Sequence, residues 1–317
     1  MTTQLRWHVG LGTAWIYAAE RELAASADAE CTTEEAVDDA TFAPFRREVA
    51  ALVAYLAAQH VEPKPLFAHL AALAPTIDAR RELAHAALTK LHGRARADSL
   101  APPGAGAGLS GLLGACERTF AAAQPKLLEE LRLRTGPLRE LWEARGPGLL
   151  AGVGRRTDPA LIVESATIAL VPPLSGTGGG EAYAPTNVVR FEAVLANPIG
   201  RLPETVRLAW LLSQLATDQL EFLLPLKTGS ARELVAAAML PAVLDGAADL
   251  ELVAEDPTLL EVAAEAWNVD VLAAPGRVDL LRTWWTMAGN NGRFADMPWN
   301  GRLGALDMMF AGEFGTE

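Results

Sequence analysis

The strongest constraint in the sequence is a helical repeat of apolar residues in the first third of the chain. Five of these residues fall on one helical face (Phe45, Val49, Leu52, Val53 and Leu56). Such a face is stable only when another element covers it. Three further segments also favour helix (Thr13–Ala25, Pro63–Ala74 and Ile77–His92). Gly93 fits the position just after the last of them, where helices commonly end. Residues 1–96 are therefore predicted to form an all-helical domain.

A linker is predicted after this helical unit. Residues 97–108 read ADSLAPPGAGAG, and Pro and small residues neither hold a helix nor add much to a core. Two or three helices are expected after it, punctuated by the Gly-Pro pairs at 136–137 and 146–147. The second domain is predicted to be residues 109–317, with a boundary near residue 150 as the alternative.

The period of the sequence changes between residues 161 and 195. Leu161–Val171 and Asn187–Leu195 are rich in branched residues and partly alternate, which is typical of strands. Because a glycine-rich connection joins them, we predict two strands, most simply antiparallel. A long helix is predicted for 203–224, with Pro203 in its first turn. The fold class is therefore mainly α, and α+β in the second half, where a helical domain carries a short antiparallel β region.

The charge balance argues against two classes of partner. The net charge is −12 and the pI is near 5.0, whereas nucleic acids and anionic membranes attract a surplus of Lys and Arg. The chain contains no apolar run long enough for a membrane-spanning helix, which needs about 20 residues. Met1–Ala19 lacks the apolar core and cleavage site of a secretory signal. We expect a soluble, acidic, cytoplasmic protein with no nucleic-acid and no membrane partner.

Metal and thiol chemistry has little support in the sequence. Cys31 and Cys116 lie far apart and form neither a CxxC pair nor a disulfide framework. Glu82 and His85 form an ExxH, the unit with which di-iron bundle proteins bind metal. Such sites need a second ExxH and two further carboxylates, and no second ExxH occurs. We therefore predict no metal and no cofactor, and we expect ordinary packed or surface histidines.

Three glycine clusters suggest phosphate-binding loops (Gly10–Gly12, Gly152–Gly154 and Gly176–Gly180). A phosphate loop needs a strand, a glycine loop and a helix N-terminus in that order, usually with a Lys or an acidic partner at a set spacing. The third cluster leads towards a second strand, and the other two lack the full GxGxxG or GxxxxGKS pattern. We predict that the glycines are flexible turns.

The elements predicted around Pro203 occur in a characteristic order. A helix, two strands and a second helix that begins after NPIGRLPE resemble the order found in zincin-type metallopeptidases. In that family the second helix carries HExxH, in which two histidines bind zinc and the Glu activates water. The matching stretch is 210–214, WLLSQ, and no histidine occurs after His92. The resemblance covers Leu161 to Leu224 and implies a degenerate, non-catalytic relative.

Tryptophan and asparagine residues gather near the C-terminus. The candidates for a ligand site are six residues within this region (Trp284, Trp285, Asn290, Asn291, Trp299 and Asn300). Aromatic faces can stack on a sugar-like ring while amide groups donate and accept hydrogen bonds. The same residues also suit core packing and turns.

The sequence contains no complete catalytic motif. We therefore expect a non-enzymatic protein that acts by association with an unknown protein partner or with copies of itself. The alternative is an enzyme or a small-ligand binding protein with a C-terminal site. A cavity beside Trp284 or Trp285 would support the alternative, and a large, flat, exposed apolar patch would support association.

Overall fold

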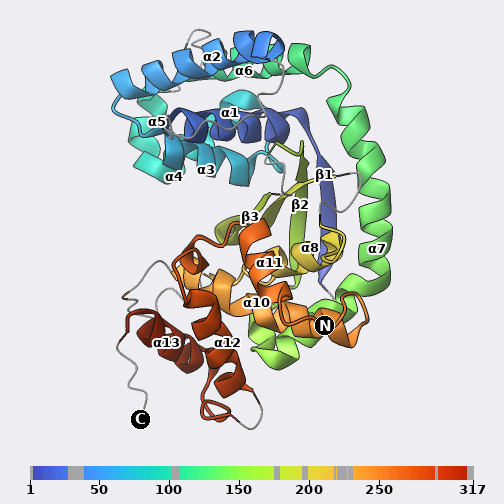
Figure 1. Ribbon diagram of the computed structural model, residues 1–317. Coiled ribbons are helices and arrows are strands. Elements are labelled where there is room, and N and C mark those ends of the chain that lie inside the picture. Colours follow the sequence, from blue (N-terminus) through green and yellow to red (C-terminus); the bar gives the residue numbers. More distant parts are fainter. Residues whose placement is uncertain are drawn as a thin grey trace. The chain divides into compact units, whose positions relative to one another are not determined.

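The computed structural model describes residues 3–27, 39–100, 108–174, 179–194, 199–217, 219, 227, 231–289 and 292–312. Within these residues the protein is mainly helical and carries a four-stranded sheet (Figure 1). The chain divides into two units. One comprises Trp7–Leu133 and Ala169–Leu174, and the other comprises Met1–Arg6, Arg134–Ile168 and Ser175–Glu317. The predicted fold class, mainly α with an α+β second half, is confirmed.

The first of these units is mainly helical and also contains the end of β1 (Gln4–Val9) and the end of β2 (Ser165–Val171). Its helices are α1 (Leu11–Ala27), α2 (Asp39–Ala58), α3 (Pro63–Leu73), α4 (Arg80–His92), α5 (Arg94–Leu100) and α6 (Leu109–Ala123). Pro63 occupies the first helical position of α3, where its missing N–H costs nothing. Gly93 follows α4 with a φ of 81°, which favours glycine. The four helices predicted from the pattern of the first 92 residues are confirmed.

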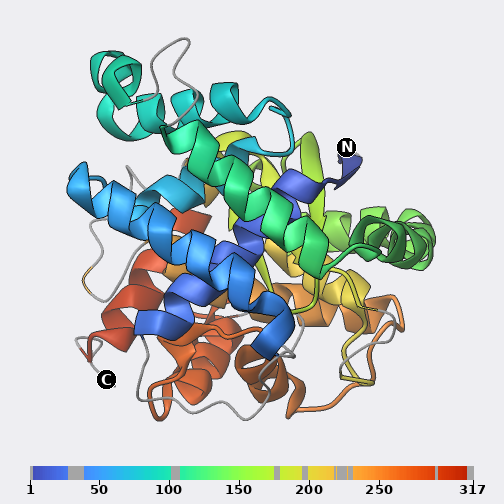
Figure 2. The ribbon, with the colours of Figure 1, turned by 90° about the horizontal axis from the view of Figure 1, so that it is seen from above.

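An aromatic cluster joins α2 to α6 in the core of this unit. The two helices run side by side in Figure 2, one blue and one green. The ring centroid of Phe120 lies 6.2 Å from that of Phe42 and 5.2 Å from that of Phe45. All three side chains are buried, and burial of a Phe side chain contributes about 1.5–3 kcal/mol.

The second unit contains α8 (Glu204–Leu212), α10 (Ala231–Asp249), α11 (Leu259–Ala266), α12 (Arg277–Ala288) and α13 (Trp299–Phe310). The 30-residue helix α7 (Leu127–Arg156) runs through both Gly-Pro pairs without a break. Gly152 of α7 faces Gly246 of α10: a Cβ at Gly152 would lie 3.8 Å from the Cα of Gly246, which is an ordinary van der Waals contact. Gly152 and Gly154 are therefore helix residues and not a turn, contrary to the prediction.

The sheet has the strand order β1-β2-β4-β3. Its strands are β1 (Gln4–Val9), β2 (Ser165–Val171), β3 (Gly180–Tyr183) and β4 (Val188–Glu192). Strands β3 and β4 pair antiparallel, with Glu181 opposite Arg190. The start of β1 lies beside the residues that precede β2: the Thr3 hydroxyl donates to the Val163 carbonyl at 2.8 Å and the Gln4 N–H donates to the Glu164 carbonyl at 2.9 Å.

Two local predictions need correction. Strand β1 lies inside residues 1–96, which were expected to be all-helical, because its hydrogen-bond partners come from a segment about 160 residues away. The helix predicted for 203–224 ends at Leu212. Ser213 caps its C-terminus and donates its hydroxyl to the Trp210 carbonyl at 2.7 Å. Residues 218 and 220–226 lie outside the described residues.

The predicted linker at 97–108 lies partly outside the described residues. Residues 97–100 belong to α5, and 101–107 are not described. Helix α6, which follows, packs on α1 and α2. The domain boundary at 97–108 stays a prediction, and cleavage of the chain tests it.

A specific protease site inserted after Gly104 should cut the chain and leave the two pieces associated. The reason is that Phe120 of α6 is buried against Phe42 and Phe45 of α2. Size-exclusion chromatography and circular dichroism of the cut protein measure this, and the uncut insertion protein is the control. Release of a separately folded fragment of residues 1–104 would instead support the boundary predicted from sequence.

Candidate functional site

Helix α8 occupies the position that the resemblance to zincins assigns to the catalytic helix. It packs on β3, β4 and α10. All nine of its residues are buried, although three of them are polar (Glu204, Thr205 and Arg207). A buried polar group is costly unless it is hydrogen-bonded, so the contacts of these residues show what the helix is built to do.

Arg207 ties α8 to the sheet. Its guanidinium group is 2% exposed and donates to the Glu192 carbonyl at 2.9 Å and to the Gly179 carbonyl. It also donates to the Glu204 carboxylate one turn away and lies over the Phe191 ring, 3.9 Å from its centroid. Arginine presents several donors and a flat apolar face at once. One side chain therefore joins the helix, β4 and the residue that leads into β3.

Two buried carboxylates complete this cluster. Glu192 is fully buried, and its carboxylate accepts from the Gly179 N–H at 2.5 Å while its own N–H donates to the Gly179 carbonyl at 3.1 Å. Burial raises the pKa of Glu204, and the nearby positive charge of Arg207 opposes that rise. Arg207 is thus the cation of this cluster that keeps the Glu204 carboxylate compatible with its buried position.

A second ion cluster lies on β3 and extends to α10. Glu181 accepts from Arg190 and from Arg232, both at 2.7 Å, and from the Tyr183 hydroxyl at 2.9 Å. Next to it, Gly180 allows β3 to approach α8: a Cβ there would lie 2.6 Å from a methyl group of Leu211 and 3.0 Å from the Arg190 carbonyl oxygen. Both approaches are too close for any other residue without movement. Packing between β3 and α8 therefore favours glycine at position 180, the first residue of β3.

The side chains of residues 210–214, the stretch that matches HExxH in position, pack against other parts of the protein and bond to its main chain. The Trp210 ring stacks on Trp267 with centroids 5.2 Å apart, and its indole N–H donates to the Ala236 carbonyl at 2.7 Å. Ser213 and Gln214 donate to the Trp210 carbonyl at 2.7 and 3.1 Å. None of these side chains is a common zinc ligand. The residues present do not fit a zinc site.

The ExxH of the N-terminal region does not assemble a cluster in the described part of the chain. His85 of α4 contacts the carboxylate of Asp98 on α5 at 2.8 Å, and Glu82 is exposed. Across the described residues no group of three or more His, Cys, Asp or Glu side chains is placed to hold a metal ion. Burial raises the pKa of the Cys116 thiol to about 12, so this thiol is protonated and a weak nucleophile at neutral pH.

The structure brings the three C-terminal tryptophans together. The ring centroid of Trp284 lies 5.9 Å from that of Trp285 and 5.7 Å from that of Trp299. Trp284 is fully buried and donates to the Arg302 carbonyl at 2.8 Å, while Trp285 donates to the Asp245 carboxylate at 2.7 Å. Two of the three indole N–H groups therefore already have protein partners.

The predicted asparagines are not shown to join the tryptophans. Asn290 and Asn291 lie outside the described residues. The side-chain oxygen of Asn300 accepts from the neighbouring Gly301 N–H at 2.8 Å, which serves the start of α13. The assignment of a ligand site to these residues stays a prediction.

Arg302 is a residue of this region that the sequence analysis missed. Its guanidinium donates to three main-chain carbonyls, those of Met297, Ala288 and Ala295, at 2.9, 3.1 and 2.7 Å. These contacts hold the segment between α12 and α13. No sequence signal marks such a role, because any exposed arginine of a helix has the same appearance.

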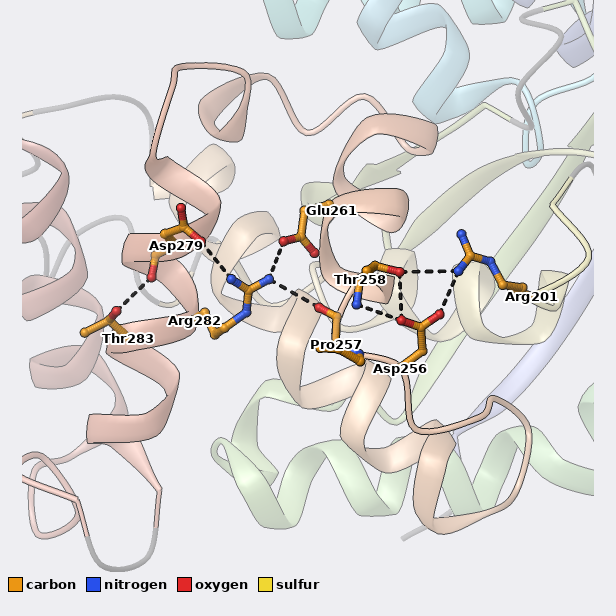
Figure 3. A network of polar contacts seen from close by, with 8 residues as sticks. All are labelled: Arg201, Asp256, Pro257, Thr258, Glu261, Asp279, Arg282 and Thr283. Carbon is orange, nitrogen blue, oxygen red and sulfur yellow. Dashed lines mark hydrogen bonds and ion pairs between the residues drawn. The ribbon is translucent and has the colours of Figure 1, made fainter.

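A surface network links the segment before α8 to α11 and α12 (Figure 3). Arg201 bonds to Asp256 at 2.6 Å, and Asp256 accepts from the N–H and hydroxyl of Thr258 at 2.8 and 2.7 Å. Arg282 bridges Asp279 of α12 and Glu261 of α11. The hydrogen bonds from Thr258 hold the pKa of Asp256 below its usual value. The network fixes element ends and presents no reactive group.

Comparison with known proteins identifies no relative of this chain: no family model, no curated protein and no solved structure matches it. No helix in the described part is long and apolar enough to cross a membrane. The contacts of α8 and of the C-terminal tryptophans are therefore the observations that bear on function.

Replacement of Arg207 by Met should lower the free energy of unfolding by about 3–5 kcal/mol, because it leaves the Glu204 carboxylate buried without its cation. Urea unfolding measures the change. Arg201→Met is the matched control, since it breaks an exposed ion pair, and exposed ion pairs contribute little to stability. The double variant Glu204→Gln with Arg207→Met should recover part of the loss. Equal effects of R207M and R201M would contradict this account.

Asp256→Asn should lower stability at neutral pH and have little effect in acid. A carboxylate whose pKa is lowered by folding stabilises the protein above its unfolded pKa of 3.8. That contribution is lost as the pH falls through the lower, folded value. Urea unfolding of both proteins between pH 3 and 7 measures it. Glu255→Gln, an exposed neighbour, is the control; a difference between wild type and D256N that does not change with pH would refute the prediction.

Proposed function

We propose that this chain is a non-enzymatic cytoplasmic protein that acts by association with a protein partner or with copies of itself. We infer that its second half is a degenerate relative of zincin-type metallopeptidases, in which the catalytic helix serves the structure. Three strands, β2, β3 and β4, lie between α7 and α8, where the sequence predicts two. The observation that carries the proposal is the burial of 210–214 behind protein contacts.

A catalytic zinc helix needs ligands on one face and an open position for water and substrate. The corresponding stretch is the end of α8 and the two residues after it. It carries Trp210 stacked on Trp267, and its polar side chains, Ser213 and Gln214, bond to the main chain. The charged residues of the helix, Glu204 and Arg207, bond to each other. The contacts of α8 therefore support a role in holding the sheet, and leave the helix without a general base or an electrophile.

Association has to use exposed apolar surface. Among the described residues five large apolar side chains are more than a third exposed (Leu133, Leu141, Leu280, Met297 and Met308). Leu133 of α7 is the most exposed of them, at 69%. Single exposed side chains are common in monomers, so they indicate where to begin the search for a contact surface.

A second candidate function is the binding of a small, sugar-like ligand or an enzymatic activity at the C-terminal tryptophans. One observation favours it: the indole N–H of Trp299 is buried and has no hydrogen-bond partner within the described part of the chain. A ligand oxygen would satisfy that donor. Titration of the protein with a panel of monosaccharides, followed by tryptophan fluorescence and compared with Trp299→Phe, distinguishes the two functions.

Native mass spectrometry of the protein purified gently from its own host tests the proposal directly. We expect no stoichiometric zinc, and either a homo-oligomer or a complex with another protein. Elemental analysis by plasma mass spectrometry checks the metal. One tightly bound zinc ion per chain would overturn the assignment of α8, and a retained small molecule would favour the second candidate function. In a complex, Leu133→Gln should weaken association if α7 forms the contact, with exposed Arg132→Gln as its control.

A further inference from the structure

The first turn of α1 has the arrangement that phosphate sites use. Strand β1 ends at Val9 and α1 begins at Leu11, so the single residue Gly10 joins a strand to a 17-residue helix. The sequence analysis treated Gly10 and Gly12 as a flexible turn. The order of strand, glycine and helix N-terminus is nevertheless present, and it is the order in which backbone N–H groups point at an anion.

Three backbone donors at this point have no acceptor. The first hydrogen bond of α1 runs from the Ala14 N–H to the Gly10 carbonyl at 3.2 Å. Within the described residues the N–H groups of Leu11, Gly12 and Thr13 have no partner, as expected for the first turn of a helix. Gly10 has no side chain that could cap them, and the first turn contains no acidic residue. The helix dipole adds a partial positive charge at the same place.

A second, independent observation comes from the side chain of Thr13. This residue is 1% exposed, and its hydroxyl has no hydrogen-bond partner in the part of the chain that the structure describes. Thr13 is the third residue of α1 and so belongs to the turn whose N–H groups have no acceptor. The Cα–Cβ bonds of a helix tilt towards its N-terminus, which is the direction of those N–H groups. A buried hydroxyl without a partner is destabilising. A ligand oxygen would satisfy it.

There is open space beside Gly12: apart from its chain neighbours and the backbone of its own helix, no atom lies within 4 Å of the place that a Cβ would take there. Beside Gly10, by contrast, the imidazole ring of His8 fills the place of a Cβ. The third glycine of a GxGxxG motif would fall at residue 15, which is a buried tryptophan. A dinucleotide needs that close approach of helix and strand, so the geometry favours a smaller anion.

We propose that the N-terminus of α1 binds the oxyanion of a phosphate group through the N–H groups of Leu11, Gly12 and Thr13 and the hydroxyl of Thr13. The site takes a free phosphate ion or a phosphate monoester. It lies within one unit of the protein and is independent of the function proposed for α8.

Thermal unfolding of the full-length protein in increasing inorganic phosphate tests the site, with chloride at equal ionic strength as the reference. We expect a saturable rise in Tm with phosphate and none with chloride. Thr13→Val should weaken phosphate binding about tenfold, because one charge-assisted hydrogen bond is lost. The same titration with O-phosphoserine identifies the source of the ligand: equal or tighter binding assigns a monoester, and weaker binding assigns the free ion.

Two substitutions at Gly12 keep the test decisive even if Thr13→Val does not fold. Gly12→Ala fits the open space and keeps the N–H group, so its phosphate affinity should stay within about twofold of wild type. Gly12→Asp places a carboxylate in the first turn, so it should raise the Tm without phosphate and abolish the response to phosphate. Absence of a phosphate effect in wild type, or an unchanged response in G12D, would overturn the proposal.

Discussion

The buried guanidinium of Arg207 is the interaction on which the arrangement of α8, β3 and β4 depends. It bonds to two main-chain carbonyls and one carboxylate, and its flat face covers Phe191. A buried charge costs several kcal/mol when its partners are missing. These contacts therefore have to form together, and the helix has one favourable position on the sheet where apolar packing alone would tolerate several.

The same contacts explain why α8 serves the fold and not a reaction. A Cβ at Gly180 would lie 2.6 Å from a methyl group of Leu211, so a side chain there would require the leucine to move. On another side Trp210 is held by Trp267 and by the Ala236 carbonyl. A substrate could reach 210–214 only by separating α8 from its neighbours, which would also break the hydrogen bonds of Arg207. Access of a substrate to 210–214 would therefore lower the stability of the protein.

The sequence predicts the parts of the fold whose signals are local. Helices α1 to α4 follow from periodicity and from Gly93, because a helix satisfies its hydrogen bonds within its own segment. Strand β1 could not be found in this way, since its partners are about 160 residues distant. The Gly-Pro pairs inside α7 mislead for a physical reason. Glycine has no Cβ to clash with the following Pro, which eases the helical conformation of residues 136 and 146. Helix α10 also runs through a proline, Pro241, which follows a leucine.

The contacts of the candidate sites likewise follow from the sequence where they are local, and not where they join distant segments. Proximity of Trp284 and Trp285 follows from adjacency, but their contact with Trp299 depends on the packing of α12 on α13. Glu204 and Arg207 had a local signal, since an acid and a base stand three residues apart in an apolar helix. The match to HExxH covers only 210–214 and does not include them.

Helices α8 and α1 differ in the charged groups of their first turns. At α8 the Glu204 carboxylate occupies the first turn and accepts from Arg207, while the hydroxyl of Thr205 has no hydrogen-bond partner in the described residues. At α1 the first-turn donors and the Thr13 hydroxyl have no partner in the described residues. A net charge of −12 repels anions at long range, yet salt screens that repulsion beyond about 10 Å. An anion held against the N–H groups of α1 experiences mainly their local field, so the overall charge of the chain does not argue against a site there.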